Sequence, residues 1–520
     1  MGGDFICAVC HTKFESRNVL FRHLREEHSE RKLAEPPSKL WEAERQAAPI
    51  VHAKIASNGK SEKKSKQKAA STVEKKELQI ETRPHTYREE LATKVSAMKE
   101  LLRRFGGASL PPPEVFESPP EHFRMRVDFD IKWTDDGPRY AMHCGPELIE
   151  VEHYPMCCKL ICEKMMPIVL QALRDESVLR AQLFQINFHA TLHGDAMVSL
   201  SYRTPYARAE RKAQMLEQGA TKAAMGKKEC TKLTSEWEAA ATRLSNRLSG
   251  VSVIGRTRGH KCVVGRLWVD EQLHVAGREG PLRYRQLEGF FSQSNASVCQ
   301  HMLAWARAVA CADDSAVGVP GVPRKDDLLE LYCGNGNFCV ALAQFFRKVF
   351  ATEMVKELID TAKFNSEANG VANIAFGRVS AEELTLAMDG SRKFARLDHV
   401  DLNSYDFQTV LVDPPRAGMG PDVCRNISRF PRIVYVSCNP ETLRDDLVLL
   451  HETHDIVRVA AFDQFAYTDH LEMGVLLVRR TEYDNQTMLS EPRRHYVWRF
   501  GVAAFAIASV AFMIAARKRT

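Results

Sequence analysis

The stretch from Leu328 to about residue 480 alternates short apolar strand patterns with helical patterns. It opens with LLELYCGNGNFCVALA at residues 328–343, which has the pattern of a strand, a glycine turn and a helix. This alternation is typical of a parallel, doubly wound sheet with helices on both faces. We therefore predict an α/β, Rossmann-like domain over residues 286–482. In such a domain, ligands bind at the carboxyl ends of the strands.

The glycine turn predicts a nucleotide-cofactor site. Gly334 and Gly336 allow the backbone to turn tightly and to approach a ligand closely. Glu353 ends the next apolar strand, where an acidic side chain accepts hydrogen bonds from both hydroxyls of an unphosphorylated ribose. S-adenosylmethionine (AdoMet) or NAD therefore fits this pattern better than NADP.

Three later segments decide between AdoMet and NAD as the cofactor. They are QTVLVDPPRAGM at residues 408–419, RIVYVSCNPETLRDDL at 432–447 and DQFAYTDHLEMGVLL at 463–477. With the glycine loop, and in the same order, they resemble the signature blocks of the tRNA (uracil-5-)-methyltransferase family of the TrmA type. The resemblance runs from about Pro111 to Val478. It implies a class I, AdoMet-dependent methyltransferase that makes 5-methyluridine in RNA.

The chemistry of uracil C5 explains why a cysteine at a strand end matters. This carbon is too weak a nucleophile to take a methyl group directly from a sulfonium. A thiolate that adds to C6 produces a reactive enolate, and Cys438 is placed for that role. The resemblance assigns removal of the C5 proton to Glu472, with His470 as a rival or assistant. Asp413, which ends another strand, can accept a hydrogen bond from the cofactor amine or from uracil N3–H.

The remaining site residues follow partly from the resemblance and partly from the chemistry of the side chains. For the cofactor these are Gln293, Tyr332, Asn337, Glu353 and Asp413, together with Gly334 and Gly336. For the RNA, Phe184 is assigned to stack on the target nucleoside, with a place in the core as the alternative. Arg416 is suited to hold the O4 enolate or a phosphate, and Arg124 and Arg126 are plausible phosphate contacts.

The N-terminus carries the ligand spacing of a C2H2 zinc finger. The four ligands are Cys7, Cys10, His23 and His28. Phe14 and Leu20 fall where the small core of such a finger needs them. We therefore predict a ββα zinc finger with structural Zn²⁺ over residues 1–32. A single finger reads only about three base pairs, so RNA or protein contact is favoured over DNA, and the partner is left open.

Two regions join the finger to the Rossmann-like domain. Residues 33–84 are rich in lysine and poor in large apolar side chains, which predicts a flexible basic linker. Residues 85–285 mix strand and helix patterns, which predicts an α+β, RNA-binding region with a basic insertion at 209–232. The net charge of +6 permits an anionic partner without demanding one.

The C-terminus carries an apolar segment at residues 500–516, in which Ser509 is the single polar side chain. As a helix this segment spans about 25 Å, and basic and aromatic residues flank it. It predicts a transmembrane tail anchor over residues 496–516. That anchor would hold a cytosol-facing enzyme on the mitochondrial outer membrane or the endoplasmic reticulum. The alternative is a helix packed on the enzyme.

The sequence as a whole predicts an AdoMet-dependent RNA uracil-5-methyltransferase that acts on T-loop uridine 54 of tRNA. One alternative keeps the chemistry and changes the substrate to ribosomal RNA. Another, of a different class, is a catalytically inactive, membrane-tethered RNA-binding or tRNA-folding protein. The presence of Cys438, Glu472 and the glycine loop favours an enzyme.

Overall fold

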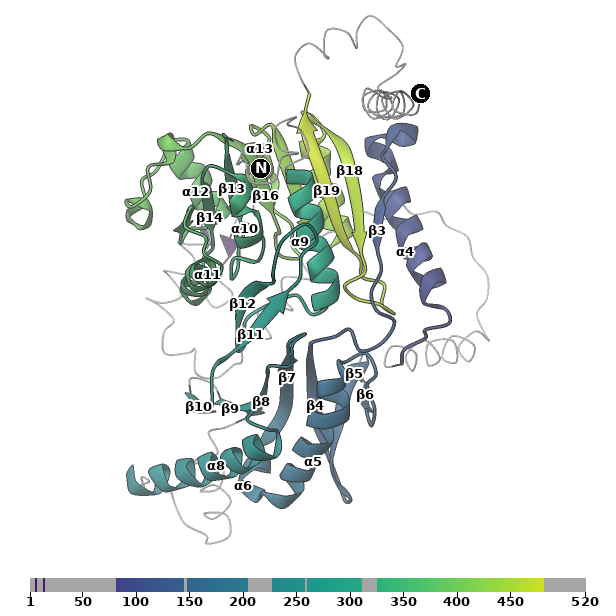
Figure 1. Ribbon diagram of the computed structural model, residues 1–520, viewed down its shortest axis with the longest axis vertical. Coiled ribbons are helices and arrows are strands. Elements are labelled where there is room, and N and C mark those ends of the chain that lie inside the picture. Colours follow the sequence, from purple (N-terminus) through teal and green to yellow (C-terminus); the bar gives the residue numbers. More distant parts are fainter. Residues whose placement is uncertain are drawn as a thin grey trace, which may run out of the picture. The chain divides into compact units, whose positions relative to one another are not determined.

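The computed structural model describes residues 5–6, 13–14, 81–144, 147–203, 227–257, 260–310 and 325–480 (Figure 1). The chain divides into two units, residues 1–69 and 70–520. In the first unit, β1 (Phe5–Ile6) pairs antiparallel with β2 (Lys13–Phe14), and Phe5 lies opposite Phe14. The second unit contains the two large sheets.

The first large sheet has eight strands in the order β15-β14-β13-β16-β17-β19-β18-β3. Its parallel part consists of β13 (Asp327–Leu331), β14 (Val349–Thr352), β15 (Ile374–Gly377), β16 (Phe407–Val412) and β17 (Arg432–Ser437). The strand β19 (Glu472–Arg479) runs antiparallel between β17 and β18 (His454–Phe462). From β13 the next strands are added toward one edge of the sheet, and from β16 onward they are added toward the other edge. The junction between β13 and β16 is therefore the switch point, where such sheets bind ligands.

Helices cover both faces of this sheet. They are α9 (Ala296–Ala310), α10 (Asn337–Leu342), α11 (Lys356–Ala368), α12 (Ala381–Met388), α13 (Pro421–Ile427) and α14 (Pro440–Leu450). Trp305 of α9 packs on Gly474, whereas the Tyr435 hydroxyl donates to Asp446 of α14 on the opposite face. With both faces covered, the central strands β13 and β17 are buried along their whole length, as the strands of parallel sheets are. The predicted doubly wound α/β fold is confirmed.

The second large sheet has seven strands in the order β10-β9-β8-β7-β4-β5-β6. They are β4 (Arg126–Thr134), β5 (Gly137–Cys144), β6 (Glu147–Glu150), β7 (Leu183–Ala190), β8 (Ala196–Tyr202), β9 (Ser252–Thr257) and β10 (His260–Val264). The helices α5 (Met166–Asp175), α6 (Ser177–Arg180) and α8 (Lys227–Arg247) accompany this sheet. Trp237 of α8 packs so closely on Gly255 that a Cβ there would lie 2.4 Å from its ring.

The boundary between the two sheets differs from the predicted one in a specific way. The helix α4 (Tyr87–Leu102) and the strand β3 (Glu114–Phe116) precede the second sheet in sequence, yet β3 pairs with β18 and α4 contacts α14. Figure 1 shows both beside the eight-stranded sheet. A hairpin of β11 (Trp268–Leu273) and β12 (Leu282–Leu287) leads from the seven-stranded sheet to α9.

The predicted membrane location needs correction. In the ranges that the structure describes, no helix is both long enough and apolar enough to cross a bilayer. The predicted anchor at 496–516 lies outside those ranges, as do residues 33–80 of the linker predicted over 33–84 and all four predicted zinc ligands. The finding that the described ranges contain no spanning helix contradicts the predicted membrane-anchored location.

Candidate active site

Three of the predicted residues meet at the carboxyl edge of the eight-stranded sheet. Asp413 follows β16, Cys438 follows β17, and Glu472 begins β19. Ser437 pairs with Met473, so continuing that register places Cys438 opposite Glu472. In an antiparallel pair, facing residues have Cα atoms about 4.5–5.5 Å apart. The thiol and the carboxyl group therefore lie on adjacent strand ends.

The loop that follows Asp413 is tied to the loop that follows Cys438. The carbonyl oxygen of Arg416 accepts hydrogen bonds from Asn439 Nδ2 at 2.9 Å and from Thr442 Oγ1 at 3.3 Å. Asn439 also caps α14, because its side chain accepts from the backbone N–H of Glu441. These bonds hold the Arg416 loop beside the cysteine.

The electrostatics of this cluster keep protons on its acids. Burial first, and then the carboxyl groups of Glu472 and Asp413, raise the pKa of the half-buried Cys438 thiol to about 11, while Arg416 opposes that rise. Burial, with a further contribution from Asp413, raises the pKa of Glu472. Glu472 is 2% exposed, and its Oε2 has no hydrogen-bond partner among the described residues. A buried carboxyl group of this kind is suited to take up a proton near neutral pH.

Alkylation of Cys438 by iodoacetamide tests these charges. With a pKa of about 11, only about one thiol in a thousand is ionised at pH 8, so alkylation should be slow. At pH 9, Glu472→Gln removes a negative charge, lowers the thiol pKa and should speed alkylation several-fold. Arg416→Ala removes the opposing positive charge and should slow it. Mass spectrometry of the modified peptide gives the rates. Equal rates in the three proteins would contradict this account of the thiol.

The glycine loop has the conformation that a cofactor site needs. Tyr332, Gly334 and Gly336 all have positive φ, at 61°, 55° and 85°. A Cβ at Gly336 would lie 3.3 Å from both Ala362 and Val340, so this glycine allows close packing beneath the loop. A Cβ at Gly334 would meet no described atom within 4 Å. The space over Gly334 is therefore open to a ligand.

Two polar groups beside the loop suit a nucleotide cofactor. Glu353 receives backbone N–H bonds from Gly334, Met354 and Val355, at 3.3, 2.6 and 2.9 Å. These bonds fix its carboxylate next to the open space. Asn337 Nδ2 is a buried donor for which the described part of the chain offers no acceptor. An unsatisfied buried donor is costly unless a ligand supplies the acceptor, so the residues present fit a bound nucleotide.

Three of the predicted RNA contacts, Arg124, Arg126 and Phe184, are not brought into this cluster. Arg126 donates to the Phe290 carbonyl and, at 3.4 Å, to Ser292 Oγ, and burial lowers its pKa. Arg124 donates from Nε to the Arg126 carbonyl at 2.8 Å. Arg126 therefore fastens the segment that carries Gln293, a role that sequence reasoning missed. Phe184 is half-buried beside a bulge in β7, on the seven-stranded sheet.

Phe291 is a candidate functional residue that was not predicted from the sequence. Phe291 is 72% exposed, and it lies two residues before Gln293 in the segment that Arg126 holds. An aromatic side chain kept in solvent beside a predicted cofactor residue is suited to stack on a base. The adjacent phenylalanines of FFSQSN were the available signal in the sequence.

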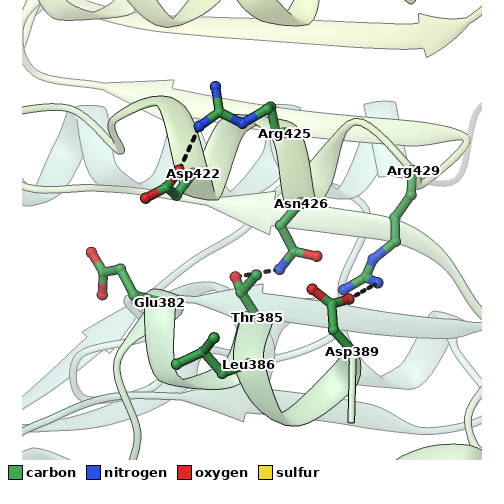
Figure 2. Close-up of a pocket in the computed structure, with 8 residues that line it drawn as sticks. All are labelled: Glu382, Thr385, Leu386, Asp389, Asp422, Arg425, Asn426 and Arg429. Atoms are coloured by element: carbon green, nitrogen blue, oxygen red, sulfur yellow. Dashed lines mark hydrogen bonds and ion pairs between the residues drawn. The ribbon is translucent and has the colours of Figure 1, made fainter. Parts of the chain in front are cut away.

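A separate groove of about 440 Å³ lies between α12 and α13 (Figure 2). Its charged side chains largely pair with one another, as in Arg425 with Asp422 and Arg429 with Asp389. Asn426 Nδ2 bonds Thr385 Oγ1 across it. None of the predicted catalytic or cofactor residues lines this groove, so we assign it no part in the reaction.

The doubly wound sheet, the glycine loop and the strand-end acids define a class I methyltransferase. The sequence profile of the tRNA (uracil-5-)-methyltransferase family matches residues 86–229 and 229–480. The chain therefore belongs to this family, which confirms the predicted resemblance.

Relatives and a solved structure agree with this assignment. The tRNA/tmRNA (uracil-C(5))-methyltransferases of Ectopseudomonas mendocina and Pseudomonas entomophila are each 45% identical to the chain over 401 residues, covering 76% of it and 98% of their own length. The structure of Pyrococcus abyssi tRNA (uracil-54, C5)-methyltransferase in complex with S-adenosyl-L-homocysteine matches with a TM-score of 0.52 at 19% identity. This match covers 75% of this chain and 83% of that one, and it shows the fold.

Proposed function

We propose that the chain transfers the methyl group of AdoMet to C5 of uracil in tRNA, at T-loop uridine 54. The observation that carries the proposal is the meeting of Cys438, Glu472 and Asp413 at one sheet edge that also holds the glycine loop. Membership of the family supports it, and so do the names of relatives that match over nearly their whole length.

In this proposal Cys438 begins the reaction. Its thiol releases a proton to solvent, and the sulfur forms a bond to uracil C6. The electron pair of the C5–C6 double bond moves toward O4, where the Arg416 charge stabilises it. Asp413 accepts a hydrogen bond either from the cofactor amine or from uracil N3–H, and the second contact would favour uracil over cytosine.

Glu472 completes the reaction. AdoMet, when bound, would supply an electrophilic methyl group and leave as S-adenosylhomocysteine, so that C5 would carry both that methyl group and its original hydrogen. Glu472 removes the C5 proton, the C5–C6 double bond re-forms, and the bond from C6 to sulfur breaks. A buried carboxyl group with a raised pKa suits this step because it binds the proton well at neutral pH.

The residues that would hold AdoMet are Gln293, Tyr332, Gly334, Gly336, Asn337, Glu353 and Asp413. The open space over Gly334, the fixed carboxylate of Glu353 and the unpaired Nδ2 of Asn337 support this set. Phe184, Arg124 and Phe291 are proposed RNA contacts outside the reacting cluster.

Two alanine substitutions in the glycine loop should separate cofactor binding from folding. Gly334→Ala places a methyl group in open space, so it should weaken AdoMet binding at least about tenfold and lower stability only by the cost of its positive φ, about 1 kcal/mol. Gly336→Ala adds a crowded Cβ, so it should lower the melting temperature more. Calorimetric titration and thermal unfolding measure the two effects. The reverse order of melting temperatures would contradict the packing of this loop.

The substrate is tested with AdoMet labelled in its methyl group. The full chain is given unmodified tRNA and ribosomal RNA separately, and the labelled nucleoside is identified by mass spectrometry. Label in 5-methyluridine from tRNA alone is the expected result. Label from ribosomal RNA alone would keep the chemistry and overturn the substrate. If folded protein that binds AdoMet labels neither RNA, the proposal that the chain is an RNA methyltransferase would be overturned.

We further propose that Cys7, Cys10, His23 and His28 bind a structural Zn²⁺. The antiparallel pairing of β1 with β2 supports this, because a hairpin supplies the two thiolates of a C2H2 finger. Full-length protein should contain one zinc per chain, and Cys10→Ser should lose it. Wild-type protein without zinc would contradict the finger.

A further inference from the structure

The loop at residues 463–471 joins β18 to β19, and Glu472 comes directly after it. Most of this loop is buried, including Asp463, Gln464 and Leu471. Its start is also fastened to the cofactor side of the site, since Gln464 Oε1 accepts from the backbone N–H of Asn295, two residues after Gln293. The position of Glu472 therefore depends on how this loop is held.

Lys94 of α4 contacts this loop at three points. Its Nζ lies 2.5 Å from Asp463 Oδ1, 3.1 Å from the Phe465 carbonyl and 3.3 Å from the His470 carbonyl. An ammonium group has three N–H donors, and one loop accepts all three. The contacts join the first residue of the loop to a carbonyl two residues before Glu472. A single side chain thus closes the loop across its ends.

The surroundings make this contact strong and specific. Asp463 is fully buried and the Lys94 side chain is 10% exposed, so water screens their attraction little. Tyr87, on the same helix α4, packs edge-on against Tyr467 of the same loop at 5.8 Å between ring centroids. The Tyr467 hydroxyl donates to the Pro120 carbonyl at 2.7 Å. The loop is therefore held from α4 and from the segment after β3.

We propose that Lys94 is a positioning residue for proton removal, acting through the 463–471 loop to hold Glu472 against the C5 proton. This rests on the proposed function, because it assumes that Glu472 is the base. It predicts that damage to the contact slows the last step of the reaction more than cofactor binding or methyl transfer. A misplacement of about 1 Å can cost about a hundredfold in rate.

Two variants separate positioning from folding. Lys94→Met removes the three donors and leaves Asp463 buried without its cation, so it should also lower stability. The double variant Lys94→Met with Asp463→Asn removes that buried charge and should recover much of the melting temperature. Lys94→Arg keeps the charge, but its planar fork cannot meet three diverging acceptors. Lys356→Met, which breaks an exposed pair with Asp360, is the matched control.

The experiment incubates each full-length variant with AdoMet and tRNA, and measures 5-methyluridine formation together with RNA that stays attached to protein in denaturing gels. We expect Lys94→Met and the double variant to turn over at least tenfold more slowly per folded molecule, with unchanged AdoMet affinity. Methylated RNA should accumulate on the protein, and Cys438→Ala in the same background should abolish the adduct. Lys94→Arg should restore stability more than rate, and Lys356→Met should match the wild type.

Two results would overturn the inference while leaving the proposed function intact. In the first, the wild type is active, and the Lys94 variants lose activity only in proportion to the folded protein that they lose. The other is slow turnover without any adduct. An inactive wild type would instead overturn the proposed function, and this inference with it.

Discussion

The Glu472→Gln variant should methylate tRNA once and then remain covalently attached to it. Without a base the C5 proton stays in place, so the double bond cannot re-form and the Cys438 sulfur cannot leave. Loss of a general base typically costs about 10²–10⁴ in rate, so turnover should fall at least a hundredfold. Glutamine keeps the size of the side chain, and AdoMet binding should be retained. A denaturing gel of enzyme with labelled tRNA measures the adduct, and nucleoside analysis shows whether it carries the methyl group.

The adduct needs its own control, because RNA can also bind a basic protein without a covalent bond. Adding Cys438→Ala to Glu472→Gln should remove the adduct completely. A Glu472→Gln enzyme that releases 5-methyluridine at the wild-type rate would show that another group takes the proton. His470, exposed two residues earlier in the chain, is then the candidate.

The Asp327→Ala variant should lose more stability than any single substitution in the active site. Asp327 is fully buried at the start of β13, where its carboxylate accepts from Arg347 Nε at 3.0 Å and Nη2 at 2.5 Å. It also accepts from the backbone N–H groups of Lys348 and Asp406, at 3.0 and 2.7 Å. The side chain thus joins the starts of β13, β14 and β16. Its removal leaves two inward N–H groups unpaired, and the free energy of unfolding should fall by about 3 kcal/mol.

Asp422→Ala is the matched control for that loss. Asp422 pairs with Arg425 three residues along α13, and its side chain is 83% exposed. Exposed pairs contribute at most about 1 kcal/mol, so thermal unfolding should barely change. Equal losses in the two variants would show that Asp327 does not hold the three strands together.

Local pattern and sheet geometry suffice to predict that Asp413 and Cys438 lie at the same sheet edge. Asp413 and Cys438 each follow an apolar strand, and the carboxyl ends of neighbouring parallel strands share one edge. The glycine loop was predictable for the same reason. Glu472 required the family resemblance, because it begins an antiparallel strand and no local pattern marks it as a base.

Contacts between distant parts of the chain could not be predicted. Arg126 was predicted to contact a phosphate, but in the structure its guanidinium donates a hydrogen bond to the Phe290 carbonyl, 164 residues away in sequence. Lys94 and Asp463 are 369 residues apart in sequence. Neither partner is marked by spacing or periodicity, because only the folded chain brings them together. The pairing of β3 with β18 belongs to the same class.

The most direct test of the central claim uses tRNA labelled with tritium at uracil C5. If Cys438 adds to C6 and C5 accepts the methyl group, each transfer must release one C5 hydrogen to water. The full-length wild type should therefore release tritium in step with methyl incorporation, and Cys438→Ala should do neither while still binding AdoMet. Methyl incorporation without tritium release, or tritium release by Cys438→Ala, would contradict the account.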